Sequence, residues 1–185
     1  DNSQSRAVIV STAKLAQTLM PAVVRSSECE FLIGMEPLKV AQEGQQSVHN
    51  WADLVGATDA DVAALTTEMA GVARDDIACL IYTSGTGGAP RGVMLHHGSI
   101  ICNVAGAAEV LREDFGLDDE RFLSFLPLSH AYEHSGGQFL PIGVGGEIYY
   151  AEGLEKLAAN IEETQPTIMV VVPRLFEVLR ARMIK

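Results

Sequence analysis

The feature that most constrains the fold is a glycine-rich segment that directly follows an apolar run. The run, Ile77–Tyr82, has the aliphatic composition of a buried strand. The next residues, 83–92, interleave hydroxyl side chains with glycines and include Pro90 and Arg91. Glycine lets a backbone turn sharply and approach a ligand closely, and successive backbone N–H groups in such a loop form an anion site. The sequence therefore predicts a strand followed by a loop that binds phosphate groups.

The spacing of the glycines distinguishes this loop from other phosphate-binding and catalytic motifs. A Walker A loop needs a lysine directly after its second glycine, and here Val93 follows Gly92. The fingerprint G-x-G-x-x-G fails because Pro90 stands at its third glycine. The nucleophile elbow G-x-S-x-G fails because Tyr82 stands two residues before Ser84. A plain glycine-rich turn remains the alternative to a phosphate loop.

The complete pattern resembles the phosphate loop of the adenylate-forming (acyl-activating) enzyme superfamily, Y-T-S-G-[ST]-T-G-x-P-K-G-V. This chain has Gly87 where that pattern has threonine, and Arg91 where it has lysine. The resemblance implies that the loop binds ATP, that Thr86 lies near a Mg²⁺ held through ATP, and that Arg91 offsets developing charge. The residues expected to bind the nucleotide are Tyr82, Thr83, Ser84, Gly85, Thr86, Gly87, Gly88, Pro90, Arg91 and Gly92.

A second segment, Phe125–His134, resembles the L-P-L-x-H segment of long-chain fatty acyl-CoA synthetases. The resemblance implies that His130 orients the acyl carboxylate and acts in catalysis together with Arg91. It also implies that Glu133 and His134 belong to the substrate pocket. The function implied is that of an AMP-forming fatty acyl-CoA ligase, which converts a fatty acid and ATP to acyl-AMP and then transfers the acyl group to CoA. An acyl-AMP ligase, a peptide-synthetase adenylation domain, and a non-catalytic nucleotide-binding or interaction module remain alternatives.

The same segment also contains the inverted zinc-protease motif H-x-x-E-H, from His130 to His134. Two histidines four residues apart on a helix can share a metal, and a glutamate can act as general base. Catalytic zinc needs a third protein ligand, and the acidic residues downstream stand in no informative arrangement. We therefore favour the acyl-site interpretation over a zinc site.

Composition limits the partners and the compartment. The formal net charge of −11 argues against nucleic acid and anionic membrane as partners, so the expected partners are the small molecules fatty acid and CoA. Three cysteines in no metal-binding spacing fit a reducing cytoplasm, and peripheral membrane association stays open. The longest apolar run, Ile168–Val172, is too short for an integral membrane segment.

Apolar runs alternate with helical patterns along the chain. Strands are expected at Ala7–Val10, Glu30–Ile33, Phe122–Leu126 and Ile168–Val172. Ser11-Thr12 can cap the first helix, and Met20-Pro21 is expected to end or kink it. Another helix is expected after the phosphate loop. Residues 36–57 are polar and predict a surface excursion. This alternation predicts an α/β fold with a largely parallel sheet and helices on both faces.

Length predicts one domain over residues 1–185. The resemblance implies a piece of the large N-terminal, AMP-binding domain of an adenylate-forming enzyme, because the family's later motifs and its small C-terminal domain are not found in this sequence. Those motifs supply an acidic Mg²⁺ ligand, a ribose contact and a mobile lysine. The isolated chain is therefore expected not to form acyl-AMP.

Overall fold

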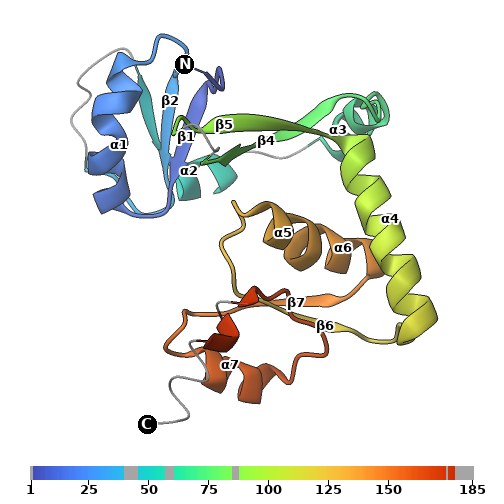
Figure 1. Cartoon of the computed structure of the whole chain (residues 1–185). Coiled ribbons are helices and arrows are strands. Elements are labelled where there is room, and N and C mark those ends of the chain that lie inside the picture. Colours follow the sequence, from blue (N-terminus) through green and yellow to red (C-terminus); the bar gives the residue numbers. More distant parts are fainter. Residues whose placement is uncertain (1, 40–45, 57–60, 85–87, 174, 178–185) are drawn as a thin grey trace. The chain divides into compact units, whose positions relative to one another are not determined.

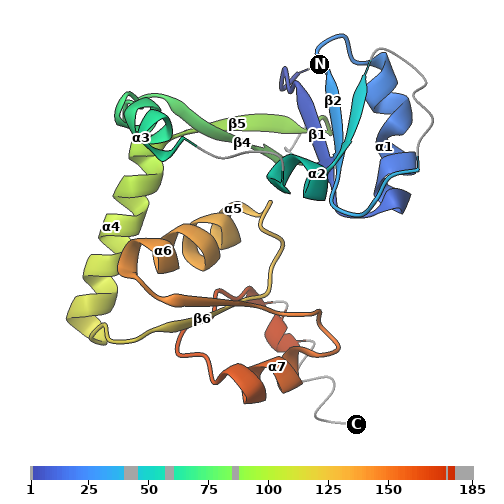
Figure 2. The same ribbon diagram turned by 180° about the vertical axis from the view of Figure 1, so that it is seen from behind.

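The computed structural model describes residues 2–39, 46–56, 61–84, 88–173 and 175–177. The chain divides into two compact units, residues 1–72 and 73–185. Figure 1 labels their helices and strands, and Figure 2 shows the same ribbon from behind. The prediction of one domain stays a prediction.

The first unit contains a three-stranded parallel sheet, with β2 between its neighbours (Figure 1). Its strands are β1 (Ala7–Val10), β2 (Phe31–Gly34) and β3 (Ser47–Asn50). Its helices are α1 (Ala13–Arg25), α2 (Trp51–Gly56) and α3 (Val62–Ala70). Leu32 is fully buried against Val10 and Ala16, so the core lies between the sheet and α1.

Helix α1 does not end at Pro21, which was one of the two outcomes predicted there, and the other, a kink, stays a prediction. Thr12 caps the helix by accepting a hydrogen bond from the Leu15 N–H over 3.2 Å. The helix then continues through Pro21 to Arg25. Ala16 and Val23, on either side of the proline, are both buried. The apolar face that they bury holds the helix together despite the hydrogen bond that proline removes.

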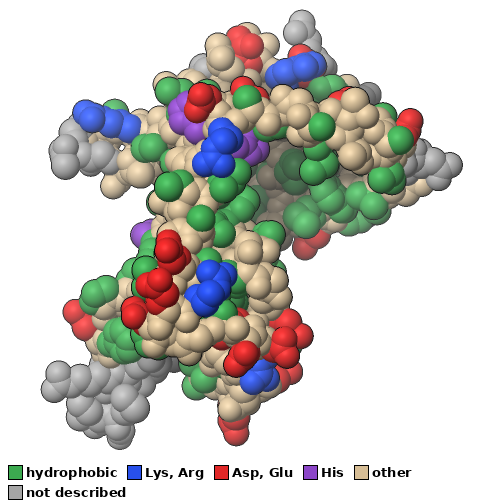
Figure 3. All heavy atoms as spheres, turned by 90° about the vertical axis from the view of Figure 1, so that its right-hand side faces the viewer, with side chains coloured by type: hydrophobic (Ala, Val, Ile, Leu, Met, Phe, Trp, Pro, Cys, Tyr) green, Lys and Arg blue, Asp and Glu red, His purple; other side chains and the backbone are tan. Residues whose placement is uncertain are grey.

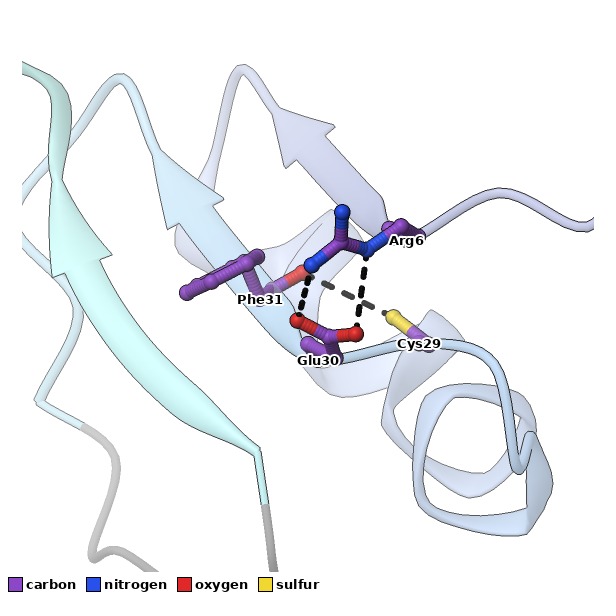
Figure 4. A network of polar contacts seen from close by, with 4 residues as sticks. All are labelled: Arg6, Cys29, Glu30 and Phe31. Carbon is purple, nitrogen blue, oxygen red and sulfur yellow. Dashed lines mark hydrogen bonds and ion pairs between the residues drawn. The ribbon is translucent and has the colours of Figure 1, made fainter.

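A polar contact joins the starts of β1 and β2 (Figure 4). The Arg6 guanidinium donates to both carboxylate oxygens of Glu30, at 3.0 and 2.7 Å. This hydrogen-bonded pairing lowers the pKa of the Glu30 carboxyl from its usual value. Next to it, the Cys29 thiol lies 3.6 Å from the Phe31 carbonyl oxygen. Both charged side chains are exposed, so the pair aligns the strand ends and adds little to stability.

The second unit contains two strand pairs with helices between them (Figures 1 and 2). An antiparallel pair is formed by β4 (Ile77–Thr83) and β5 (Arg91–His96). A parallel pair is formed by β6 (Arg121–Ser124) and β7 (Glu147–Tyr150). The helical elements are α4 (His97–Asp114), α5 (Ala131–Glu133), the π-helix η1 (His134–Phe139), α6 (Leu140–Val144) and α7 (Leu157–Thr164).

Strand β6 is covered by helices on both of its faces. Successive side chains of a strand point to opposite faces, and Phe122 packs with Ala108 of α4 and Leu140 of α6. The next residue, Leu123, packs with Leu157 of α7. The α/β prediction is thereby confirmed, with parallel pairing in both units.

The structure departs from the predicted elements at three places. Residues 91–96 form strand β5 before the expected helix begins, because this short run pairs with β4. Residues 168–172 form no extended strand and contribute one parallel bridge, from Ile168 to Phe122. The polar stretch 36–57 contains β3, whose partner is the apolar strand β2. In each case pairing across the chain decides the conformation, and local composition does not reveal it.

Hydrophobic side chains also reach the surface (Figure 3). In β5, Val93 and Met94 are 44% and 58% exposed, and in α4 Ile101 and Val110 are each at least half exposed. Soluble proteins seldom leave broad apolar faces uncovered.

Within the described ranges, no helix combines the length and the apolar character that crossing a membrane requires.

Candidate active site

The predicted phosphate loop joins the two strands of the β4–β5 hairpin. Thr83 pairs with Arg91, and Tyr82 pairs with Gly92. The ladder therefore places Arg91 directly across from the first hydroxyl of the motif. Residues 85–87 lie outside the described part of the chain, so the roles of Gly85, Thr86 and Gly87 stay predictions.

Two glycines of the motif occupy positions where a side chain would be unfavourable. Gly88 has a φ of +83°, in the left-handed region that L residues rarely adopt. Gly92 lies under the Tyr82 ring: an added Cβ would stand 3.0 Å from Tyr82 Cζ. The backbone conformation accounts for glycine at position 88, and the Tyr82 ring accounts for glycine at position 92, independently of any ligand.

The polar side chains beside the loop are open to solvent. Thr83, Ser84 and Arg91 are all exposed, and so is Pro90. Two hydroxyls can donate to an anion, and a guanidinium offers several donors in a planar fork that suits phosphate. Among the described residues no ion pair engages Arg91, so this end of the hairpin can meet a phosphate group with its guanidinium available.

His130 stands at the start of the second predicted segment and caps helix α5. Its Nδ1 accepts a hydrogen bond from the Tyr132 N–H over 3.2 Å. With Nδ1 acting as acceptor, the neutral ring carries its proton on Nε2. The His130 side chain is exposed, so it can offer the Nε2–H to a carboxylate or a carbonyl oxygen.

An open, mainly apolar cavity of about 500 Å³ lies beside α4 and the segment after His130. Val104, Ala107 and Val110 of α4 line it, together with Tyr132, Gly136 and Val170. Tyr132 and Gly136 are cavity residues that the sequence motifs did not predict. The available signal was their spacing, since residues four apart on a helical segment share one face.

Glu133 and His134, both predicted in the substrate pocket, have other neighbours. Glu133 is fully buried and accepts a hydrogen bond from Ser124 Oγ at 2.6 Å. His134 Nε2 lies 3.6 Å from the Cys79 sulfur of β4. Burial raises the pKa of the Cys79 thiol, so the sulfur stays protonated at neutral pH. Neither residue lines the 500 Å³ cavity, and their assignment to the substrate pocket stays a prediction.

The three polar side chains of the H-x-x-E-H motif do not share a centre. His130 caps its own helix, Glu133 bonds to Ser124, and His134 contacts Cys79. Over the described ranges, no three metal-binding side chains come together. The geometry therefore lends no support to a zinc site at this motif.

Comparison with known proteins identifies the family. The profile of AMP-binding enzymes matches residues 1–185. The chain belongs to the AMP-binding enzyme family. Among relatives of this AMP-binding protein, long chain acyl-CoA synthetase 7, peroxisomal, from Arabidopsis thaliana is 42% identical over 105 residues, covering 55% of this chain and 14% of the relative. A chloroplastic long-chain-fatty-acid–[acyl-carrier-protein] ligase from the same plant is 28% identical over 188 residues, covering 96% of this chain and 25% of the relative.

Solved structures share the fold. The adenylation domain of a carboxylate reductase from Mycobacterium chelonae superposes with a TM-score of 0.71 at 17% identity, covering 97% of this AMP-binding chain and 29% of that one. A benzoate CoA ligase from Burkholderia xenovorans superposes with a TM-score of 0.64 at 26% identity, covering 93% of this chain and 31% of the ligase. The chain spans between 14% and 25% of the length of the two curated relatives.

Proposed function

We propose that this chain carries the phosphate loop and part of the acyl site of an AMP-forming fatty acyl-CoA ligase of the long-chain type. The observation that carries the proposal is the pairing of Thr83 with Arg91 across the loop. The same unit holds His130, whose exposed ring uses Nδ1 as an acceptor and so leaves Nε2 as the donor. The relatives named as long-chain synthetases or ligases support the acyl class.

The apolar cavity supports a long-chain substrate. Its lining is mainly hydrophobic, and transfer of a hydrocarbon chain from water to such a surface is favourable by about 0.8 kcal/mol per buried CH₂. Tyr132, which lines the cavity, follows His130 by two residues. An acyl chain held there would have its carboxylate near the segment that presents His130.

The proposed reaction has two displacement steps. A carboxylate oxygen of the fatty acid attacks the α-phosphorus of ATP, and the bond to the β-phosphate breaks, which gives acyl-AMP and pyrophosphate. The sulfur of CoA then attacks the acyl carbonyl carbon, and AMP leaves. Positioning and charge stabilisation are the tasks left to the protein. Arg91 would bind phosphate oxygens, and the His130 Nε2–H would hold the acyl carboxylate in line.

Magnesium would neutralise charge on the ATP phosphates. It binds protein through few ligands and keeps phosphate oxygens and waters as the others, so one hydroxyl such as that of Thr86 is a suitable partner. Thr83 and Ser84 at the loop's entrance are exposed and polar, which fits a hydrated ion–nucleotide complex.

The decisive test is fatty-acid-dependent exchange of labelled pyrophosphate into ATP by the full-length protein, followed by a product assay with CoA. Exchange that needs a long-chain fatty acid, and acyl-CoA on adding CoA, are expected. His130→Ala should slow exchange by about tenfold to a hundredfold, since a hydrogen bond to a charged group contributes roughly 1.5–3 kcal/mol.

The same assay separates the competing interpretations. Zinc chelators should leave the exchange rate unchanged, and stoichiometric zinc that is lost on changing His130 would instead establish a metal site. Exchange without acyl-CoA formation would point to another acceptor, such as an acyl carrier protein. Absence of fatty-acid-dependent exchange would refute the proposed function.

Replacing Arg91 distinguishes charge from geometry. Arg91→Ala should slow exchange more than Arg91→Lys, because lysine keeps the charge and loses only the bidentate fork. The expected loss for alanine is about tenfold to a hundredfold, from the energy of a charge-assisted hydrogen bond. Equal losses in both variants would mean that charge is not the property used. Arg112, an exposed residue in the last turn of α4, offers a matched control, and Arg112→Ala should leave the rate unchanged.

A further inference from the structure

Glu133 is a carboxyl side chain in an unusually costly position. It is 0% exposed, and its Oε1 accepts a hydrogen bond from Ser124 Oγ at 2.6 Å. Its Oε2 is buried and has no hydrogen-bond partner among the residues that the structure describes. Glutamate is almost never fully buried unless it is paired, and a buried polar atom without a partner costs free energy. A side chain chosen for packing alone would be apolar.

The hydrogen bond to Ser124 ties two segments together. Ser124 is the last residue of β6 and is itself buried, and its carbonyl oxygen accepts from the Ala151 N–H at 2.8 Å. Its hydroxyl reaches the short helix α5, nine residues further along the chain. Glu133 therefore fastens α5 to the end of a core strand.

The turn that contains Glu133 also holds His130. The His134 N–H donates to the His130 carbonyl oxygen at 2.9 Å, and the Tyr132 N–H donates to His130 Nδ1. Both the backbone and the ring of His130 are thus bonded to the turn that Glu133 anchors. A shift of α5 relative to β6 would move the imidazole with it.

Two further contacts limit how this turn can move. His134 lies 3.6 Å from the Cys79 sulfur in β4, and its ring packs on Phe139 with centroids 4.8 Å apart. The residues after Glu133 wind as a π-helix, a rare form that occurs frequently at functional sites. The Glu133 carboxylate lies against Gly137, where an added Cβ would stand 2.2 Å from Oε1.

We propose that Glu133 is a positioning residue for His130, acting through its hydrogen bond to Ser124. The inference rests on the proposed function, since His130 must contact the acyl group for its position to matter. Glu133 itself touches no reacting atom. Its task is to keep the Nε2–H of His130 at one place relative to β6 when the fatty acid binds.

The test uses steady-state pyrophosphate exchange by the full-length protein with Glu133→Ala, Glu133→Gln, Ser124→Ala and the Ser124→Ala/Glu133→Ala double variant. Glutamine keeps an acceptor for the serine hydroxyl, so Glu133→Gln should stay within about threefold of the parent kcat/KM for fatty acid. Glu133→Ala and Ser124→Ala should each lose about tenfold in this quantity, with the KM for ATP unchanged. The double variant should be no worse than Glu133→Ala, because both changes remove one interaction.

Asn160→Ala provides the matched control. Asn160 is another buried polar residue of the same unit, and it bonds to Glu152, so its loss should lower stability without changing the KM for fatty acid. Thermal unfolding of every variant identifies those that fail to fold. If Glu133→Ala fails to fold, Ser124→Ala, which is the smallest change, still tests the positioning role.

Three results would overturn the positioning role. The first is that Ser124→Ala and Glu133→Ala keep the kcat/KM for fatty acid of the unmodified protein. The second is an equal loss of kcat/KM in Glu133→Gln and Glu133→Ala. The third is that the KM values for fatty acid and for ATP change in the same way as in Asn160→Ala. An active parent with unaffected variants refutes only this inference. A parent without fatty-acid-dependent exchange refutes the proposed function and the positioning role with it.

Discussion

Thr86→Ala in the full-length protein should slow acyl-adenylate formation by about a hundredfold to a thousandfold, the usual loss on removing one preorganised donor from a charged transition state. The threonine stands in the middle of the loop between Thr83 and Arg91, where its hydroxyl is expected to meet the metal and the phosphates. The rate of pyrophosphate exchange at saturating fatty acid and ATP measures the effect.

The metal dependence of this variant checks the assigned role. Removing a hydroxyl beside the ion should raise the Mg²⁺ concentration that gives half the maximal rate, while the KM for fatty acid stays the same. Thr66→Ala is a suitable control, because the Thr66 hydroxyl donates to the Val62 carbonyl oxygen within its own helix. Unchanged turnover in Thr86→Ala would rule out a part for this hydroxyl in catalysis.

Gly137→Ala should destabilise the protein by about 1–3 kcal/mol, the range for overpacking a filled core. The new Cβ would stand 2.2 Å from Glu133 Oε1 and 2.6 Å from its Cδ. A flexible carboxylate in solvent would simply move away, but Glu133 is fully buried and held by Ser124. Denaturant-induced unfolding of the two proteins measures the difference.

Two further variants isolate the clash as the cause. In a Glu133→Ala background the carboxylate is gone, so Gly137→Ala should then cost far less, and a double-mutant cycle reports the difference. Gly106→Ala in α4 meets no atom within 4 Å, and it should stabilise the helix by about 0.5–1 kcal/mol. Equal costs for Gly137→Ala in both backgrounds would contradict the explanation.

Local sequence patterns predicted those parts of the fold that depend on neighbouring residues. The run Ile77–Tyr82 does form a strand that leads into the glycine-rich segment, and Thr12 caps α1 through its own hydroxyl. The α/β class followed from the alternation of such elements and is confirmed by the parallel pairs. These features need only the periodicity and capping chemistry of a few adjacent residues.

What the sequence could not show depends on residues that only the fold brings together. The burial of Glu133 depends on Ser124 at the end of a strand and on the absence of a side chain at Gly137. The sequence alone shows at this place only the H-x-x-E-H pattern, which suggests a metal site. The continuation of α1 past Pro21 likewise depends on a packed face. Strand β5 was missed because its pairing with β4 is a contact across the loop, which the local composition of residues 91–96 does not reveal.

The hairpin ladder has a consequence for how this loop can vary. Paired residues in an antiparallel ladder keep their Cα atoms about 4.5–5.5 Å apart, so the pairing of Thr83 with Arg91 fixes the two ends of the loop whatever lies between them. A substitution inside the loop, such as glycine for threonine at 87, can change the donors offered to a ligand without moving the cation. A slip of β5 by one residue would do the reverse: every donor in the loop would survive, and Arg91 would turn to the opposite face of the hairpin. The loop residues can therefore change without altering the distance between Thr83 and Arg91, whereas the position of Arg91 depends on the register of β5 against β4.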